Sequence, residues 1–300
     1  MTTAVPAAPL GRVLTAMATA FHADGSLDLD GTQAIARHLV TNGNDGIVVS
    51  GTTGESPTTT QAEDGEILAA VRDAVGPDVV LVAGVGTNDT RTSVELARQA
   101  RARGADGVLL VTPYYSKPAQ RGILHHFRQV ADAAELPVML YDIPGRTGSQ
   151  IAMASYEEMA SWDEVVAVKD AVGDLVRGHR ISQLGFAVYS GDDALNLGWL
   201  AYGAVGVVSV CGHAAGNELR AMVEAHLGGD ALGAHQVFTR LLPAFDAMMG
   251  VPNYGATTAK AALQLLGVLP NRNVRSPLVP LDDAEVAALR AGLEASGLIP

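Results

Sequence analysis

The chain has 300 residues, of which 48% are hydrophobic and 17% are charged, and its formal net charge is −12. This composition supplies a large apolar core, which excludes a disordered chain or a coiled coil, and the negative charge argues against nucleic acid as a partner. We expect no membrane span, because no run of about 18 apolar residues occurs. The lone cysteine, Cys211, and the lack of a recognisable secretory signal fit a cytoplasmic protein.

Eight short apolar runs alternate with longer stretches that have helical spacing. The expected strands are 13–21, 46–50, 79–85, 107–112, 137–143, 165–169, 187–190 and 206–210, and the clearest helices between them are 28–41, 60–75, 90–103 and 118–134. Strand–helix alternation implies parallel pairing with right-handed crossovers. Eight such units predict an α/β fold, a closed (β/α)8 barrel. The alternative is an open doubly wound sheet, but its dinucleotide fingerprint G-x-G-x-x-G is absent after the first strand.

Four further stretches with helical spacing follow the eighth strand, at 214–226, 231–249, 257–266 and 282–296. We expect the first to be the last helix of the barrel and the other three to form a C-terminal extension. The predicted organisation is therefore an N-terminal arm at 1–11, a barrel at 12–228 and a C-terminal helical region at 229–300.

A lysine lies inside the sixth expected strand, in the stretch VVAVKDAVG at 165–173. It is one of only three lysines, Lys117, Lys169 and Lys260, among 20 basic residues. A strand of this kind is buried on both faces, and burial lowers the pKa of a lysine and leaves a neutral amine. Such an amine can attack a carbonyl carbon and form a Schiff base, whereas arginine keeps its proton. The alternative is a lysine at the rim of the strand that pairs with Asp170.

The loop after the second strand reads SGTTGES at 50–56. Its two glycines let backbone N–H groups approach an anion, and Thr52 and Thr53 add hydroxyl donors. A phosphate loop would need a lysine in this loop, so a carboxylate is the expected ligand. An ordinary turn with a helix cap is the alternative.

Other polar residues follow the fourth, fifth and seventh strands, where barrel enzymes gather their functional groups. Tyr114 and Tyr115 lie between two prolines, and Tyr141 lies near the end of the fifth strand, where a phenol near a Schiff-base lysine can relay protons. Arg146 follows on a Pro-Gly turn and suits a bidentate grip on a carboxylate. An aromatic packing role for the adjacent tyrosines is the alternative.

Several other polar residues are expected to have structural roles. Asp192 and Asp193 follow the seventh strand, and helix capping is the expected role there, because no zinc-like spacing of His and Cys surrounds them. We therefore expect no metal. The sequence G-x-S-x-G of a hydrolase triad is absent, and His125 and His126 are expected to face solvent.

These motifs in this order closely resemble the dihydrodipicolinate synthase family of pyruvate-dependent class I aldolases, from about Arg12 to the C-terminus. The resemblance implies that Lys169 forms a Schiff base with pyruvate and that the derived enamine attacks aspartate 4-semialdehyde, in diaminopimelate and lysine biosynthesis. It also implies no cofactor and a homotetramer built as a dimer of dimers. By the same resemblance, Tyr141, Thr53 and Tyr115 form a proton relay, in which Tyr115 reaches into a neighbouring subunit. Thr52 and Thr53 bind the carboxylate of pyruvate, and Arg146 binds the carboxylate of the semialdehyde. Gly191 and Val208 line the pocket through backbone contacts.

The sequence departs from lysine-inhibited members of the family at the regulatory cleft. Ser56, Asn88 and Tyr114 match that cleft, but three positions that carry histidines or a glutamate in those members are Gln61, Asp64 and Thr92 here. We predict weak or absent inhibition by lysine.

Two alternative functions are considered. A sister aldolase, such as an N-acetylneuraminate lyase or a 2-keto-3-deoxy sugar acid aldolase, shares the lysine and the tyrosine, but Arg146 argues against it. A catalytically silent barrel would lack Lys169, Tyr141 or Thr53, and all three are present.

Overall fold

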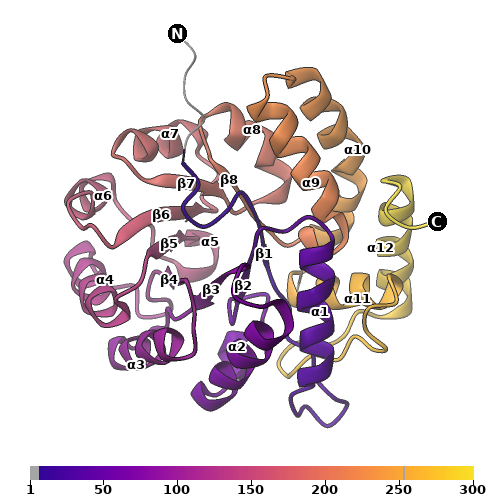
Figure 1. Cartoon of the computed structure of the whole chain (residues 1–300), viewed down its shortest axis with the longest axis horizontal. Coiled ribbons are helices and arrows are strands. Elements are labelled where there is room, and N and C mark those ends of the chain that lie inside the picture. Colours follow the sequence, from indigo (N-terminus) through magenta and orange to yellow (C-terminus); the bar gives the residue numbers. More distant parts are fainter. Residues whose placement is uncertain (1–6, 253) are drawn as a thin grey trace.

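Eight parallel strands close into a barrel at the centre of the molecule (Figure 1). The computed structural model describes residues 7–252 and 254–300, so residues 1–6 of the expected N-terminal arm lie outside the described residues. The strands are β1 (Val13–Ala16), β2 (Gly46–Val49), β3 (Val80–Gly84), β4 (Gly107–Val111), β5 (Val138–Asp142), β6 (Val165–Asp170), β7 (Ala187–Ser190) and β8 (Gly206–Ser209). Each pairs with the next, and β8 pairs with β1. The predicted barrel is confirmed.

The first strand is shorter than its apolar pattern predicts. The pattern extends over 13–21, but β1 ends at Ala16. Met17 N still donates to Val48 O of β2 at 2.9 Å, but the buried backbone beyond it bonds to side chains: Ala18 N donates to His213 Nε2 at 3.0 Å, and Ala20 N donates to Thr32 Oγ1 at 3.1 Å. An apolar run in the sequence indicates that a segment is buried. Because this loop and the strand before it are both buried, the run does not show where the hydrogen bonding of the sheet ends.

Most helices of the barrel lie in a ring outside the strands, whereas the short α5 (Pro144–Thr147) lies near its centre, at the cavity described below (Figure 1). The barrel helices are α1 (Leu29–Thr41), α2 (Gln61–Val75), α3 (Thr90–Ala102), α4 (Gln120–Ala134), α5 (Pro144–Thr147), α6 (Met153–Met159), α7 (Leu175–Gln183), α8 (Asn196–Ala201) and α9 (Gly212–Leu227), with two short 3-10 helices, η1 (Ser56–Thr58) and η2 (Asp193–Leu195). Side-chain caps start several of them, as when Asp28 accepts from Gly31 N at 2.7 Å and Asp89 accepts from Thr92 N at 3.2 Å. None of the described helices is both long and apolar enough to cross a membrane.

One expectation for the helix surfaces is wrong. His125 is exposed, but His126 is only 3% exposed, and its Nδ1 lies 2.9 Å from Thr90 Oγ1. Neighbouring residues on a helix point about 100° apart, so one of two adjacent histidines can face α3 while the other faces solvent. Burial lowers the pKa of His126 to about 4, and the imidazole is neutral at pH 7.

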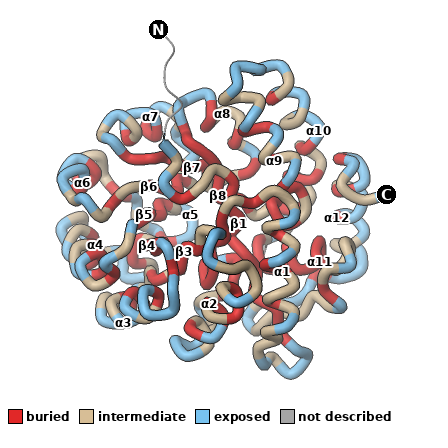
Figure 2. Tube along the Cα trace, viewed as in Figure 1, coloured by how far each residue is buried: buried red, intermediate tan, exposed pale blue. Residues whose placement is uncertain are grey.

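Buried residues lie along the strands and the inner sides of the surrounding helices, whereas exposed residues lie at the periphery (Figure 2). Leu14, Val48, Val82, Met139 and Tyr189 belong to a cluster that fills the barrel interior, whereas a larger cluster lies between the strands and the outer helices. Since successive strand residues point to opposite faces, each buried strand contributes to both layers.

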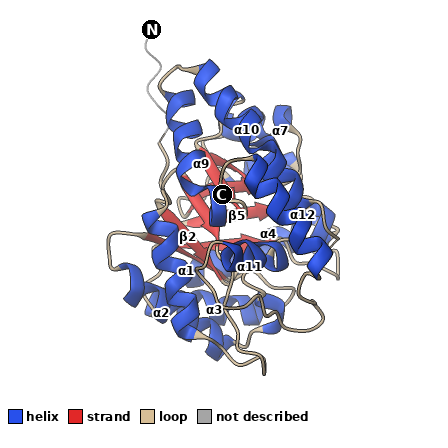
Figure 3. Cartoon of the chain, turned by 90° about the vertical axis from the view of Figure 1, so that its right-hand side faces the viewer, coloured by secondary structure: helices blue, strands red, loops and turns tan. Residues whose placement is uncertain are grey.

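The chain continues into α10 (Ala231–Met249), α11 (Ala256–Leu265) and α12 (Asp283–Ala295), which are the predicted three-helix extension. They lie on one side of the barrel next to α9 (Figure 3). Leu219, Phe245, Met248, Leu289 and Leu293 belong to a second apolar core that α9, α10 and α12 share. The extension therefore packs on its own barrel.

Candidate active site

A cavity of about 220 Å³ opens at the C-terminal ends of the strands. Its lining includes Thr52, Thr53, Tyr141, Arg146, Lys169, Gly191 and Tyr254. The first six of these come from the loops and ends of β2, β5, β6 and β7, where the barrel brings together residues that are up to about 140 positions apart. The structure therefore gathers six of the eight predicted site residues around one cavity.

Lys169 and Tyr141 lie side by side on β6 and β5, because they are direct partners in the sheet register. The Lys169 Nζ lies 4.4 Å from the centroid of the Tyr141 ring, and the two residues are 4% and 6% exposed. Burial lowers the pKa of Lys169 to about 8, with a smaller opposing effect from Asp193 and a further lowering by Arg146. Burial also raises the pKa of the Tyr141 phenol, which stays protonated at neutral pH.

Asp193 supplies a fixed negative charge near Lys169. Its carboxylate accepts from Ser209 Oγ at 2.5 Å, from Val210 N at 2.9 Å and from Cys211 N at 2.9 Å. These bonds lock a 2% exposed carboxylate against the end of β8. The sequence predicted a capping role for Asp192 or Asp193, and Asp192 does cap η2 by accepting from Ala194 N at 3.1 Å. The electrostatic role of Asp193 was not predicted.

The loop after β2 places Thr53 in the cavity wall. Thr53 is 5% exposed, whereas Thr52 is exposed. A close approach by β3 fixes the start of the loop, since a Cβ on Gly84 would lie 2.2 Å from the Ser50 carbonyl oxygen. Only glycine fits at that position.

Arg146 and Gly191 complete the predicted set in the cavity. Arg146 lies on α5, is exposed, and its guanidinium carbon lies 4.8 Å from the centroid of the Tyr254 ring. Gly191 N donates to Asp170 O at 2.8 Å, and a Cβ on Gly191 would come within 3.1 Å of Lys169 Cγ. Gly191 therefore leaves the space that the lysine side chain occupies.

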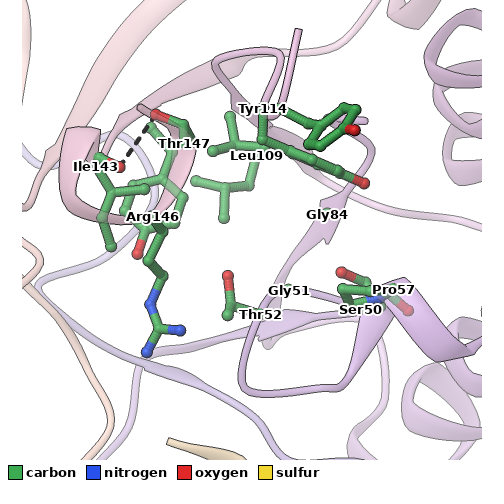
Figure 4. Close-up of a pocket in the computed structure, with 15 residues that line it drawn as sticks. Ser50, Gly51, Thr52, Pro57, Gly84, Leu109, Tyr114, Ile143, Arg146 and Thr147 are labelled. Atoms are coloured by element: carbon green, nitrogen blue, oxygen red, sulfur yellow. Dashed lines mark hydrogen bonds between the residues drawn. The ribbon is translucent and has the colours of Figure 1, made fainter. Parts of the chain in front are cut away.

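The structure does not bring Tyr115 or Val208 into this cavity. Val208 is 1% exposed and belongs to the interior core of the barrel, whereas Val210 lines the cavity. Tyr115 is 89% exposed and has a φ of 71°, a left-handed conformation that is uncommon outside glycine. It borders a second cavity of about 320 Å³ (Figure 4), which also contacts Tyr141 and Arg146.

The model of the dihydrodipicolinate synthetase family matches residues 9–296. The chain belongs to this family. It is 53% identical to 4-hydroxy-tetrahydrodipicolinate synthase 2 of Streptomyces coelicolor over 99% of this chain and 98% of the relative, and 54% identical to the Acidothermus cellulolyticus 4-hydroxy-tetrahydrodipicolinate synthase over 99% and 96%.

Solved structures of dihydrodipicolinate synthases superpose on nearly the whole chain. The enzyme from Cyanidioschyzon merolae with lysine bound has a TM-score of 0.93 at 40% identity and covers 97% of this chain and 99% of its own. The chloride-inhibited enzyme from Acinetobacter baumannii, complexed with pyruvate, has a TM-score of 0.92 at 31% identity, with 97% and 100% covered.

In this member of the dihydrodipicolinate synthetase family, the segment between α10 and α11 also reaches the cavity. Met249, Tyr254, Gly255 and Ala256 line it, although the sequence placed all four in a separate C-terminal region. No motif marks them, and only the folded positions of α10 and α11 bring them over the barrel. Sequence reasoning had no signal for these residues.

Acidic residues next to the cavity are held by protein groups. Asp142 and Asp170 each follow a cavity residue by one position, so they point away from the cavity, and both bind Arg177. Among residues 7–252 and 254–300, no group of three or more His, Cys, Asp or Glu side chains could hold a metal ion. That this chain works without a metal stays a prediction.

Proposed function

We propose that this chain is a 4-hydroxy-tetrahydrodipicolinate synthase, which condenses pyruvate with L-aspartate 4-semialdehyde in diaminopimelate and lysine biosynthesis. The observation that carries the proposal is the buried Lys169 amine, with a lowered pKa, beside the Tyr141 phenol in the cavity. The names of relatives that are 53% and 54% identical over 99% of the chain support the same reaction. We also expect the enzyme to work in the cytoplasm.

The reaction begins when the neutral Lys169 amine attacks the ketone carbon of pyruvate. The resulting carbinolamine loses water to give an iminium ion, and loss of a methyl proton then gives an enamine. The enamine carbon attacks the aldehyde carbon of the second substrate. The amino group of that substrate then attacks the iminium carbon, closes the ring and releases Lys169 as a free amine.

The side chains around Lys169 suit the proton transfers and charges of these steps. Tyr141 and Thr53 lie in the cavity wall and pass protons between the reacting groups. Thr52, Thr53 and the glycines of their loop bind the pyruvate carboxylate, and Arg146 binds the carboxylate of the semialdehyde. Gly191 and Val210 complete the lining of the pocket. The iminium ion itself withdraws electrons, so the chemistry needs neither a metal nor an organic cofactor.

We propose that two copies of the chain complete each other's sites. Tyr115 is almost fully exposed in a strained conformation beside a second cavity, so its side chain is available to a neighbouring subunit. Val176 and Tyr202 are also exposed apolar side chains, 52% and 43%, on α7 and just after α8, which pack together. Two apolar surfaces of this kind support a dimer of dimers.

Borohydride trapping tests the function directly. The protein is incubated with pyruvate, reduced with borohydride and mapped by mass spectrometry. We expect one reduced pyruvate on Lys169 and none on Lys169→Ala. A wild-type protein that gives no adduct would instead be the catalytically silent barrel.

A coupled assay separates the synthase from a sister aldolase. We expect turnover with pyruvate plus aspartate semialdehyde and none with sialic acid or keto-deoxy sugar acids, because Arg146 suits an aldehyde substrate that carries a carboxylate of its own, in addition to that of pyruvate. Turnover of a sugar acid alone would favour the sister aldolase.

A further inference from the structure

A second buried lysine lies below the Thr52–Thr53 loop. Lys260 is on α11 and is 1% exposed, and its Nζ binds the Glu55 carboxylate, which belongs to a residue that is 2% exposed. Glu55 ends the GTTGE motif, so the pair joins a cavity loop to a helix of the C-terminal extension. The reaction described above uses neither residue.

Every charged atom of this pair has a partner. Lys260 Nζ also donates to Asn273 O at 2.7 Å and lies 4.3 Å from the centroid of the Phe21 ring. The second oxygen of the Glu55 carboxylate accepts from Arg275 N at 2.8 Å. A buried ion pair of this kind tolerates the loss of water only when its geometry is fixed and its remaining lone pairs and protons are bonded.

Further contacts extend the pair into a clamp around the loop. The Arg275 guanidinium binds both oxygens of Glu63 at 2.6 and 3.0 Å and donates to Thr58 O at 2.8 Å. Arg275 therefore ties the start of α2 to the same C-terminal segment that contacts Glu55. Its guanidinium carbon lies 4.3 Å from the centroid of the Phe21 ring, the ring that Lys260 also contacts.

Glu55 transmits this clamp to the predicted pyruvate site through the backbone. Its φ is 60°, a left-handed conformation that is unfavourable for glutamate, and its N–H donates to Thr52 O at 3.1 Å. On the other side of the loop, Thr19 Oγ1 donates to Gly54 O at 2.9 Å. The bonds of the Glu55 side chain stabilise its unfavourable left-handed backbone conformation. That conformation in turn sets the position of Thr52 and Thr53.

The side chains of Lys260 and Lys169 point to different surroundings. Burial lowers the pKa of each to about 8, but only Lys169 lines the cavity, whereas the Lys260 Nζ faces Glu55 and a backbone carbonyl. Lys260 is therefore not a second Schiff-base lysine.

We infer that Lys260 and Glu55 are a positioning pair, which holds the Thr52–Thr53 loop in the conformation that binds the carboxylate of pyruvate. This inference rests on the proposed function. Neither residue touches substrate, and both act through the loop.

The test is Lys260→Met, which removes the ammonium group and keeps most of its volume. Because a small displacement of a binding loop weakens binding strongly, we expect the KM for pyruvate to rise about tenfold. The pyruvate concentration that half-saturates borohydride trapping should rise equally, while the KM for aspartate semialdehyde stays within about twofold. An unchanged KM for pyruvate in the folded variant would overturn the inference.

Two further variants keep the test decisive. Glu55→Gln combined with Lys260→Met removes the unpaired carboxylate, so it should unfold at a higher temperature than Lys260→Met alone and still show the raised KM for pyruvate. Arg220→Met is the matched control, because it breaks the Arg220–Asp45 ion pair at the opposite end of the barrel. It should lower the unfolding temperature and leave the KM for pyruvate unchanged.

The outcomes also separate this inference from the proposed function. A wild-type protein without turnover or adduct contradicts the function. If the wild-type protein turns over normally and the double variant binds pyruvate as tightly as wild type, only the inference of a positioning pair is contradicted.

Discussion

The pKa of Lys169 sets the pH dependence of the first chemical step. With a pKa of about 8, roughly one tenth of the amine is neutral at pH 7, against less than about one in a thousand for an ordinary lysine. We expect the initial rate of pyruvate trapping to rise about tenfold per pH unit below 8 and to level off above it. Rates measured in rapid-quench experiments from pH 5.5 to 9.5 check this, and a rise that continues undiminished to pH 9.5 would contradict it.

Asp193 provides the companion variant for this profile. Its negative charge raises the pKa of Lys169, so Asp193→Asn should shift the midpoint of the trapping profile to lower pH. The amide oxygen can still accept from the end of β8, which limits the structural change. A midpoint that moves to higher pH would show that the carboxylate acts in some other way.

Tyr254 is expected to orient Arg146 toward the second substrate, since the guanidinium stacks on its ring at 4.8 Å. A cation–π contact at a partly exposed site contributes about 0.5–1 kcal/mol, which corresponds to an increase of about two- to fivefold in the KM for aspartate semialdehyde in Tyr254→Ala. The KM for pyruvate should not change. Tyr254→Phe keeps the ring and is the control, so an equal effect in both variants would exclude stacking as the cause.

The sequence identifies those site residues that lie at the end of an apolar strand or in the loop after it. Lys169 and Tyr141 are near the ends of β6 and β5, and Thr53 is in the loop after β2, and barrel topology places all these strand ends around one opening. Tyr254 and Lys260 follow no strand, and their contacts span 108 and 205 positions in the chain, from Arg146 and Glu55 respectively. Only the packing of the extension on the barrel reveals them.

Among the elements, β5 and β6 are joined behind the cavity by a buried ionic network. Arg177 on α7 donates to Asp142 at 2.6 Å, to Asp170 at 3.0 Å and to Ile151 O at 2.7 Å. Burial raises the pKa of Asp170 to about 6, and the Val172 N–H and then the Arg177 guanidinium oppose this rise and favour the charged carboxylate. The network fixes the register that places Tyr141 beside Lys169.

Arg177→Met should therefore destabilise the whole barrel. Removing one partner from a buried ionic network costs about 3–5 kcal/mol, because uncompensated charges remain. Arg180→Met, an exposed arginine on the same helix, should change the free energy of unfolding by less than about 0.5 kcal/mol. Urea unfolding measures both, and similar values for the two variants would show that the network contributes little.

The number and order of the strands follow from the sequence, because each strand is a short apolar run between polar helices. The strand ends and the short elements do not follow. Buried loop and buried strand look alike after Ala16, and α5 arises where the Pro144–Gly145 turn closes into one helical turn. The end of β1 is followed by long-range bonds such as that from Ala18 N to His213, and α5, although its backbone bonds are local, is also bound by Thr112 Oγ1 at Thr147 Oγ1. No local sequence pattern encodes these long-range contacts.

At the scale of the whole molecule, lysine should not regulate the enzyme. Gln61 is exposed, Thr92 donates to Asp89 at 2.6 Å, and Asp64 is partly buried with its pKa raised by burial. These groups offer a bound lysine neither imidazole nor a free carboxylate. We expect nearly full activity at about 1 mM lysine. At this concentration, lysine would occupy most of a regulatory site whose dissociation constant is well below 1 mM. Clear inhibition at sub-millimolar lysine would contradict this.

Subunit mixing tests the proposal that the exposed Tyr115 serves a neighbouring subunit, which would make the dimer the smallest active unit. Lys169→Ala and Tyr115→Ala should each be inactive or nearly so, but a mixed dimer contains one site with Lys169 from one subunit and Tyr115 from the other. Random re-association after mild denaturation should therefore restore about a quarter of wild-type activity, because half of the dimers are mixed and each has one complete site. A tyrosine that served its own subunit would leave every mixed site incomplete, and the mixture would then stay as inactive as its two parents.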